Sequence, residues 1–573
     1  MRQSVAAWAL GLLRLDFTGI AFGALFFCLS LTPSLLPRDW ISAGVIGGIN
    51  AAVGYGIGVL AAVAVRGLML RGRNWWPPSR RVRLRLQTAT AAAAIVAGLL
   101  MVVPAAAWQR RVAELMGITG PDTGGYLRVL PVAVVTAGAL IAGARVIKDA
   151  IKHLARWMIR RWRIDDEVAM FVGTAVVVAV LITVVNGVLF RGFVAGASVV
   201  FQPQNSTTQT GVAQPQLPER SGSPDSFVPW DTLGFQGRTF VATGPRAEEL
   251  TALNGRTAKQ PIRIYAGLQS GDSVEGRVAL LLSELQRTRA FERRVLVIVP
   301  TTGTGWVDPV AARAIESIYN GDTALVAMQY SYLPSWISFL ADRSTSVEAG
   351  RAMIEAVARR WSQWPAGSRP RLALYGESLG AMAGQGAFGY LPDVAEKGFS
   401  SVLWVGPPNA SSLWQALTVR RDPGTPEVEP RYDDGRTVRF AQSASSAEIA
   451  TVAAPPWPDT RVLFLQHASD PVVWWSPDLL LQRPDWLTEA PGFDRTPSMR
   501  WYPIVTFLQV TADMAGNVTD SAGIPTGHGH NYGDRQLDGW VAVAAPAGWT
   551  PADTERVRGG LREAMAAGGP EFA

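Results

Sequence analysis

The chain has 573 residues, of which 48% are hydrophobic and only 17% charged, and its formal net charge is +7. This length exceeds one ordinary domain, and the shortage of charge indicates that part of the chain belongs to a membrane. A single cysteine, Cys28, excludes a disulfide framework, a cysteine-based zinc site and a cysteine nucleophile in the later part of the chain.

Five apolar runs precede residue 200, and each is long enough to cross a bilayer, for which a helix needs roughly 20 residues. They are Phe17–Leu36, Ile41–Val65, Thr88–Trp108, Leu127–Ile147 and Val168–Phe190. We therefore expect an all-α transmembrane domain of about five helices over residues 1–200. The first run lacks a small-residue cleavage site, which favours a retained helix over a removed signal peptide.

Basic residues are concentrated in two of the loops between these runs. Residues 66–86 contain seven arginines and no acid, and residues 145–167 contain seven Lys or Arg against four acids. The positive-inside rule predicts that both loops are cytoplasmic, so that the amino terminus is cytoplasmic and the chain after Phe190 is periplasmic, outside the inner (plasma) membrane. The combined net charge of the two loops exceeds the net charge of the whole chain. The basic residues therefore indicate membrane lipids as partners and no nucleic acid. Residues 146–163 fit either an in-plane amphipathic helix or an extension of a spanning helix.

Residues 201–226 are rich in Gln, Pro, Ser, Thr and Gly, which predicts a flexible linker. Residues 227–573 alternate short apolar runs with longer amphipathic stretches. Strands are expected at Val295–Pro300, Ala324–Tyr330, Leu372–Gly376, Ser401–Gly406 and Val462–His467, with another within Trp501–Thr511 and a helix over Ser344–Trp361. Continuous apolar strands separated by helices predict a mostly parallel sheet with helices on both faces.

The segment "LALYGESLGAMAGQG" contains G-x-S-x-G between a predicted strand and a helix-compatible run. This context is the one that a nucleophile elbow requires, so Ser378 is the predicted nucleophile. A serine hydroxyl needs a base, and the chain has four histidines. His528 and His530 lie together in "PTGHGHNYGD" near the carboxyl end. His530 is favoured because Tyr532 can pack on its ring, and His528, flanked by glycines, is the alternative.

The acid that orients such a base is expected after a strand, between the serine and the histidine. Asp470 in "VLFLQHASDPVVWW" satisfies this, whereas Asp478 and Asp494 do not directly follow a strand. The order Ser378, Asp470, His530 is that of α/β-hydrolases.

An oxyanion hole needs two backbone N–H groups. One is expected from Leu379, and the other from Thr302 or Gly303 in "PTTGTGW". Trp306, Trp474 and Trp475 are candidates for contact with substrate, although the last two equally fit a core position. The run "YSYLPSWISFL" fits a lid or an interfacial contact as well as it fits core.

Four segments resemble a bacterial family of membrane-anchored α/β-hydrolases, in which a multi-pass region precedes an extracytoplasmic hydrolase domain. They are "SLTPSLLPRDW" (Ser30–Trp40), "WDTLGFQGRTFVATGP" (Trp230–Pro245), "YGESLG" (Tyr375–Gly380) and "GHGHNYG" (Gly527–Gly533). The resemblance implies a hydrolase and says little about the substrate. Glu377 departs from the His or Tyr of many lipases.

The sequence thus predicts a membrane-tethered serine esterase or lipase that acts on an envelope or lipid-like ester through an acyl-enzyme. An acyltransferase that modifies an envelope lipid or glycan is the alternative with the same chemistry. A catalytically dead scaffold or transport component is the alternative of another class. No cofactor and no metal are expected, and the oligomeric state is left unspecified by the sequence.

Overall fold

The computed structural model describes residues 15–69, 80–162, 201–341, 343–442, 459–519 and 523–572, with isolated positions 165, 172, 174–176, 196, 456 and 457. The described residues form two compact units. Unit 1 holds those of Met1–Arg191, Pro477–Leu487 and Arg495–Asp513, and unit 2 those of Gly192–Ser476, Thr488–Asp494 and Met514–Ala573. The sequence predicts a single division near residue 200, so the return of two later segments to unit 1 differs from that expectation.

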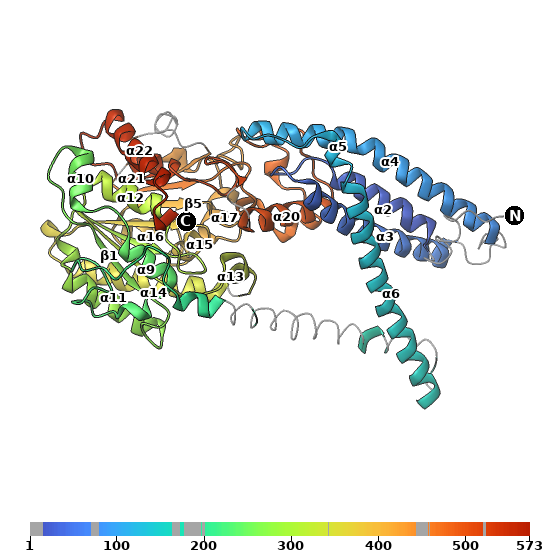
Figure 1. Ribbon diagram of the computed structural model, residues 1–573, viewed down its shortest axis with the longest axis horizontal. Helices are drawn as coiled ribbons and strands as arrows, with labels where there is room; N and C mark the ends of the chain where they lie inside the picture. The colour runs from blue at the N-terminus through green and yellow to red at the C-terminus, as the bar shows by residue number, and fades with distance from the viewer. Residues whose placement is uncertain are drawn as a thin grey trace. The chain divides into compact units, whose positions relative to one another are not determined.

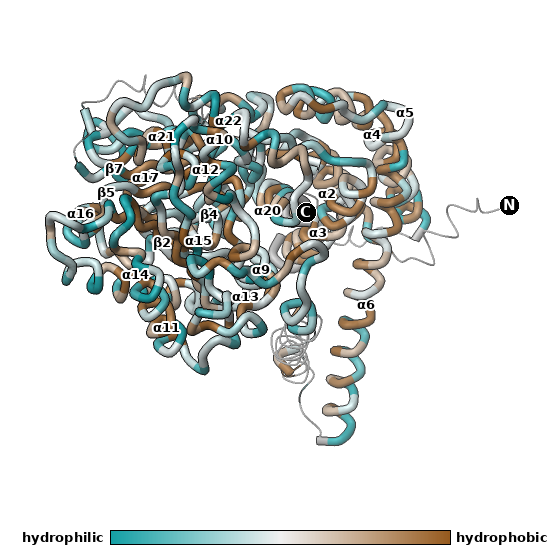
Figure 2. The backbone as a smooth tube through the Cα atoms, turned by 60° about the vertical axis from the view of Figure 1, so that its left-hand side comes forward, coloured by the Kyte–Doolittle hydropathy of each residue, from teal (hydrophilic) through white to brown (hydrophobic). Residues whose placement is uncertain are grey.

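Unit 1 is helical (Figure 1). Its helices are α2 (Phe17–Ser30), α3 (Trp40–Met69), α4 (Arg80–Leu115), α5 (Thr123–Tyr126), α6 (Val129–Trp162) and α20 (Val505–Thr519) as far as Asp513. Among the residues that the structure describes, three stretches are long and apolar enough to cross a membrane, namely Trp40–Val65, Arg81–Leu115 and Thr123–Arg161, and α2 is apolar but shorter. Figure 2 shows the hydrophobic colouring of α2, α3 and α4. The fifth predicted span, Val168–Phe190, falls outside the described residues.

Helix α6 runs without a break for 34 residues. At about 1.5 Å per residue it is roughly 50 Å long, which exceeds the roughly 30 Å of a bilayer core. Its last turn carries Arg160 and Arg161. Residues 146–163 were open to two interpretations, an in-plane amphipathic helix or an extension of a spanning helix. The structure has the second, because α6 continues through this segment as far as Trp162.

A buried ion pair fastens α20 to the segment that follows α2. Arg38 donates through Nε to Oδ1 of Asp513 at 2.8 Å, and through Nη2 to the carbonyl of Gln509 at 2.7 Å. The other carboxylate oxygen of Asp513 accepts from the hydroxyl of Ser34 and from the N–H of Leu35. The segment "SLTPSLLPRDW" thus supplies the partners of a charge that α20 buries.

The strand predicted within Trp501–Thr511 is wrong, because the structure has helix α20 there. The buried positions of α20 recur every four residues, at 505, 509 and 513 and again at 506, 510 and 514. Two of these positions are Gln509 and Asp513, and the Nε2 group of Gln509 and the carboxylate of Asp513 have hydrogen-bond partners in unit 1. Polar residues on the buried face conceal the helical period of the sequence.

Unit 2 is built on a sheet of seven strands in the order β1-β3-β2-β4-β5-β7-β6, with every pair parallel. The strands are β1 (Ile262–Ala266), β2 (Val295–Pro300), β3 (Thr323–Met328), β4 (Arg371–Glu377), β5 (Phe399–Val405), β6 (Val438–Ala441) and β7 (Arg461–Leu465). The helices are α9 (Gly234–Ala242), α10 (Ala247–Asn254), α11 (Val274–Arg287), α12 (Pro309–Ile318), α13 (Ser335–Ala341), α14 (Arg343–Ser362), α15 (Leu379–Gln385), α16 (Pro392–Glu396), α17 (Ser412–Val419), α19 (Pro471–Trp474), α21 (Arg535–Ala544) and α22 (Pro551–Ala566). The predicted α/β architecture is confirmed.

Helices cover both faces of this sheet (Figure 1). Alternate residues of β2, such as Val297, pack in one core with Ile315 of α12, Trp540 of α21 and Leu561 of α22. The intervening residues, such as Ile298, are equally buried, and α14 and α15 pack on β2. Burial on both faces explains why β2 reads as an uninterrupted apolar run.

The segment expected to be a flexible linker is bound to unit 2. The guanidinium of Arg220 is buried and donates to the carbonyls of Thr243 and Pro245, and the hydroxyl of Ser221 donates to Glu284. Burial lowers the pKa of Arg220 to about 9. These contacts differ from the expectation because polar residues pair with backbone carbonyls and a buried carboxylate here, and so need no large apolar side chains.

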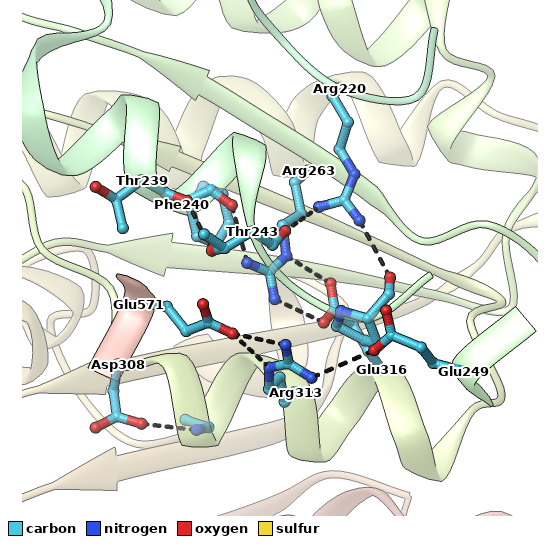
Figure 3. A network of polar contacts seen from close by, with 12 residues as sticks. Arg220, Thr239, Phe240, Thr243, Glu249, Arg263, Asp308, Arg313, Glu316 and Glu571 are labelled. Carbon is cyan, nitrogen blue, oxygen red and sulfur yellow. Dashed lines mark hydrogen bonds and ion pairs between the residues drawn. The ribbon is translucent and has the colours of Figure 1, made fainter. Parts of the chain in front are cut away.

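A buried ion pair joins β1 to α12 (Figure 3). Arg263 donates to both oxygens of Glu316, at 2.8 and 2.7 Å, and to the carbonyl of Phe240 at 2.8 Å. Both charged side chains are almost wholly excluded from solvent. Each charge therefore depends on the other for its compensation.

We predict that Glu316→Ala lowers the free energy of unfolding by ~3–5 kcal/mol, because it leaves the buried Arg263 guanidinium without its counter-ion. Glu292→Ala, which removes the exposed partner of Arg289, is the matched control and is expected to leave the free energy of unfolding nearly unchanged, because water screens an exposed pair. Denaturant unfolding of the purified full-length protein, followed by tryptophan fluorescence, measures both. Equal losses in the two variants would contradict the importance given to the buried pair.

Candidate active site

Ser378 occupies a sharp turn between β4 and α15. Its φ of 53° and ψ of −123° lie where residues other than glycine are uncommon. The flanking glycines allow this turn, because a Cβ on Gly376 would lie 2.6 Å from the carbonyl oxygen of Gly380, and one on Gly380 would lie 2.3 Å from that of Pro300. The G-x-S-x-G spacing thus follows from close backbone packing between β4, α15 and the end of β2.

Asp470 and His530 are hydrogen-bonded to each other. Asp470 follows β7 and caps the start of α19, where its Oδ1 accepts from the N–H of Val472 at 2.8 Å. Its Oδ2 lies 2.7 Å from Nδ1 of His530 and also accepts from the hydroxyl of Tyr532 at 2.7 Å. The carboxylate is wholly buried, so the imidazole ring is held by a fixed anion.

The same histidine lies beside the strand end that holds Ser378. A Cβ on Gly406 would lie 2.6 Å from Cε1 of His530, so the ring rests on the backbone just after β5. The preceding residue, Val405, accepts the N–H of Ser378 at 2.9 Å. Nε2 of His530 is buried and has no hydrogen-bond partner in the part of the chain that the structure describes. A proton acceptor is therefore available at this edge of the sheet.

Two opposing effects act on the pKa of His530. Burial lowers it, whereas the charge of Asp470 and its hydrogen bond raise it, and the net result lies above the ordinary value of 6.5. The charge of Glu377 also contributes upward. A neutral imidazole, the form that accepts a proton, therefore predominates only at a higher pH than for a free histidine.

His528 has a different carboxylate. Its Nδ1 lies 3.3 Å from Oδ2 of Asp494. The same Oδ2 accepts a hydrogen bond from the hydroxyl of Ser469, and Oδ1 of Asp494 accepts one from the N–H of Ser469. The hydroxyl of Ser469 in turn accepts the N–H of Gly529, between the two histidines. The structure thus gives each histidine its own acid, and Asp494, which the sequence ranked below Asp470, is the acid of His528.

Both loop candidates for the oxyanion hole already donate elsewhere. The N–H of Thr302 donates to the carbonyl of Trp306 at 3.2 Å, and that of Gly303 donates to the hydroxyl of Ser335 in α13 at 3.2 Å. Leu379 is the first residue of α15, where a backbone N–H has no partner within its own helix.

Of the three tryptophans considered for contact with substrate, two are buried in the protein interior. Trp474 is wholly buried, donates to the carbonyl of His467 at 2.9 Å and packs edge-on against Trp414, which is the core position considered above. Trp475 is also buried and meets Phe339 of α13 edge-on. Trp306 is half-buried. The run "YSYLPSWISFL", for which a lid, an interfacial contact and a core position were equally open, contributes Tyr330 and Phe339 to the buried interior.

A group of buried acids lies beneath the elbow. Glu377 accepts from the hydroxyl of Tyr375 at 2.8 Å, and burial together with the charge of Asp308 raises its pKa to about 8. Burial likewise raises the pKa of Asp308, which caps α12, to about 6. Nothing in the sequence sets Asp308 apart, because a carboxylate before a proline-led helix is ordinary capping chemistry. Among the described residues, no group of three His, Cys, Asp or Glu side chains is arranged to hold a metal ion.

A parallel sheet with a serine elbow after a central strand, and a carboxylate and a histidine at the same edge, defines an α/β-hydrolase fold. The chain belongs to the α/β-hydrolase family, because the model of that family matches residues 262–557 and the model of the family's N-terminus matches residues 31–245. No curated protein and no solved structure matches the chain in the comparisons.

We predict that Glu377→Gln stabilises the protein more at about pH 8 than at about pH 5, by roughly 1–3 kcal/mol. The folded-state pKa of Glu377 is about 8, against 4.5 when unfolded, so wild-type stability falls as the pH rises through this interval. Glutamine keeps an acceptor for Tyr375 and carries no proton to lose. Melting temperatures of the full-length protein at both pH values measure this, with Glu355→Gln, an exposed residue of α14, as the control. A wild type and a Glu377→Gln variant with the same pH dependence would contradict it.

Proposed function

We propose that this protein is a membrane-tethered serine hydrolase of the esterase or lipase type, in which Ser378 is the nucleophile, His530 the base and Asp470 the residue that orients it. The observation that carries the proposal is the 2.7 Å contact between Asp470 and His530, at the sheet edge where Ser378 occupies the strained turn. Membership of the α/β-hydrolase family supports it.

The proposed reaction proceeds through an acyl-enzyme. Oγ of Ser378 attacks the ester carbonyl while its proton passes to Nε2 of His530, and Nδ1–H remains bonded to Asp470. The tetrahedral intermediate expels the alcohol, which takes the proton from Nε2. Water then attacks the acyl-enzyme, gives its proton to the same nitrogen, and releases the acid with the serine hydroxyl restored. Tyr532 keeps the Asp470 carboxylate in place throughout.

For the oxyanion we propose the N–H of Leu379 and that of Gly303. The present partner of Gly303 is a hydroxyl carried by α13, so movement of this one side chain releases the donor. Thr302, in contrast, donates within its own turn to Trp306, and its release requires the turn to open. Two such donors stabilise charge that develops only during the reaction.

The proposed substrate is an ester with an apolar acyl part in the cell envelope. The support is the N-terminal region, in which three helices are long and apolar enough to cross a membrane and so confine the enzyme to a membrane surface. The predicted orientation places unit 2 in the periplasm. The same acyl-enzyme transfers its acyl group to an envelope lipid or glycan if an alcohol replaces water.

The first test uses a fluorophosphonate probe on membranes that contain the full-length protein. We expect the probe to label Ser378, and expect Ser378→Ala to abolish labelling and His530→Ala to slow it on the order of 10⁴-fold, because the triad members act as a unit. His528→Ala is the matched control, since it removes the neighbouring histidine and is expected to change the rate less than about tenfold.

Mass-spectrometric mapping of the adduct identifies the labelled residue. Loss of labelling in His528→Ala alone would overturn the choice of base but retain the enzyme. A folded wild type that neither reacts with the probe nor hydrolyses a short-chain ester would support the scaffold or transport alternative.

We further predict that the rate of labelling rises with pH through a midpoint above 6.5, the ordinary value for histidine, because only the neutral imidazole accepts the proton. The charge of Glu377 also raises the pKa of His530. Glu377→Gln, which removes that charge, is therefore expected to move the midpoint to lower pH. Labelling rates between about pH 5 and about pH 9 test this. A midpoint below 6.5 would contradict the assignment of Asp470 as the dominant charge at His530.

A further inference from the structure

Unit 1 contains a groove of about 560 Å³ among α2, α3, α4 and α6. This volume is in the range of ligand pockets, about 300–1,000 Å³. Of the residues that line it, only Tyr55 and Arg145 have polar side chains. The groove is therefore an apolar channel with a small number of polar groups, and it is separate from the residues assigned to the proposed reaction.

The groove has one apolar end and one polar end. Phe27 and Leu130 line the first, since a Cβ on Gly98 would contact both. At the other end the hydroxyl of Tyr55 accepts the N–H of Asp16, where α2 begins. Helix α6 runs parallel to α3, with Thr136 against Gly48, which brings Arg145 near the level of Tyr55.

The length of the groove suits one acyl chain. It follows α2 from Gly19 to Phe27, about 12 Å at 1.5 Å per residue, and continues to Leu15 just before the helix. Half of a bilayer core is about 15 Å. Its rim is strongly apolar, because Ile95 and Val134 expose 63% and 70% of their surfaces. Large exposed apolar side chains of this kind favour contact with hydrocarbon over contact with water.

Arg145 is the charged residue that lines the groove. Its Nη2 is buried and has no hydrogen-bond partner within the described ranges. A guanidinium nitrogen that is shielded from water without an acceptor is costly, and a phosphate oxygen is an acceptor that matches guanidinium geometry and charge. An anion at this end of the groove would satisfy it.

We propose that the groove binds one phospholipid, with an acyl chain along α2 and α6 and the headgroup phosphate at Arg145. A bound lipid of this kind differs from the surrounding bilayer because it is fixed by shape on one side and by charge at one end. The proposal rests on membrane insertion of unit 1 and is independent of the chemistry proposed at Ser378.

The structure offers matched variants on α6. A Cβ on Gly138 or on Gly143 would meet no other atom within 4 Å, and only Gly138 lines the groove. Gly138→Leu therefore fills the groove, whereas Gly143→Leu adds the same side chain outside it. Both changes favour the helix, so neither is expected to impair folding. Arg145→Gln has Arg156→Gln, an exposed arginine of the same helix, as its control.

The test uses the full-length protein in nanodiscs of phosphatidylcholine with a trace of phosphatidylglycerol that carries a photoreactive acyl chain. Adducts are mapped by mass spectrometry. We expect adducts on groove residues of α2 and α6, reduced about tenfold in Gly138→Leu and Arg145→Gln and unchanged in the two controls. A photoreactive diacylglycerol, which has no phosphate, is expected to be insensitive to Arg145→Gln.

Equal labelling of Gly138→Leu and Gly143→Leu would overturn the proposal and indicate ordinary surrounding lipid. A photoreactive amino acid at Val134 tests whether a protein segment occupies the groove in place of lipid. A cross-link from it to residues 168–190 of the same chain, or to a second copy, in place of lipid, would also overturn the proposal.

Discussion

The geometry around the proposed site depends on the buried carboxylate of Asp470. One oxygen begins α19 by accepting the N–H of Val472, and the other accepts from both His530 and Tyr532. A carboxylate without solvent is tolerable only when its oxygens are satisfied, so the partners are as constrained as the acid itself. The ring of Tyr532 also stacks on His467 at 4.1 Å between centroids, and its hydroxyl accepts the N–H of His467. One charge thereby fixes the loop after β7 and the loop before α21 against each other.

The same requirement recurs at other buried charges of the chain. Glu316 is satisfied by Arg263, and Asp513 by Arg38 together with the residues of the "SLTPSLLPRDW" segment. Each pair joins elements that are distant in sequence, because a buried charge cannot rely on water and must find an opposite charge elsewhere in the chain. The segment after α2 therefore binds α20 and compensates its buried carboxylate. This role explains why a proline-containing loop next to an apolar helix carries an arginine.

These buried charges also explain how far the sequence could predict the fold. Strand β2 was predicted with its observed bounds because it is apolar on both faces, and the long helices of unit 1 were predicted by length and hydropathy. Strand β1 is not predicted by the sequence because Arg263 interrupts its apolar run. Helix α20 shows no clear helical period because Gln509 and Asp513 lie on its buried side. In both cases the partner that makes burial possible lies far away in the chain. Local periodicity contains no information about such a partner.

At the candidate site, too, some features follow from the local sequence and others depend on distant partners. Ser378 and Asp470 could be predicted because each directly follows or closely follows an apolar strand, and parallel strands end at one edge. The choice between His528 and His530 could not be derived from the sequence, since both lie in one glycine-rich loop. It depends on which carboxylate each ring meets, and the structure brings Asp494 to His528 and Asp470 to His530. The oxyanion donors were open for a similar reason, because the N–H of Gly303 is directed by Ser335 of a later helix. Chain order is thus sufficient to collect the chemical groups at one edge, whereas their pairing is decided by packing between loops.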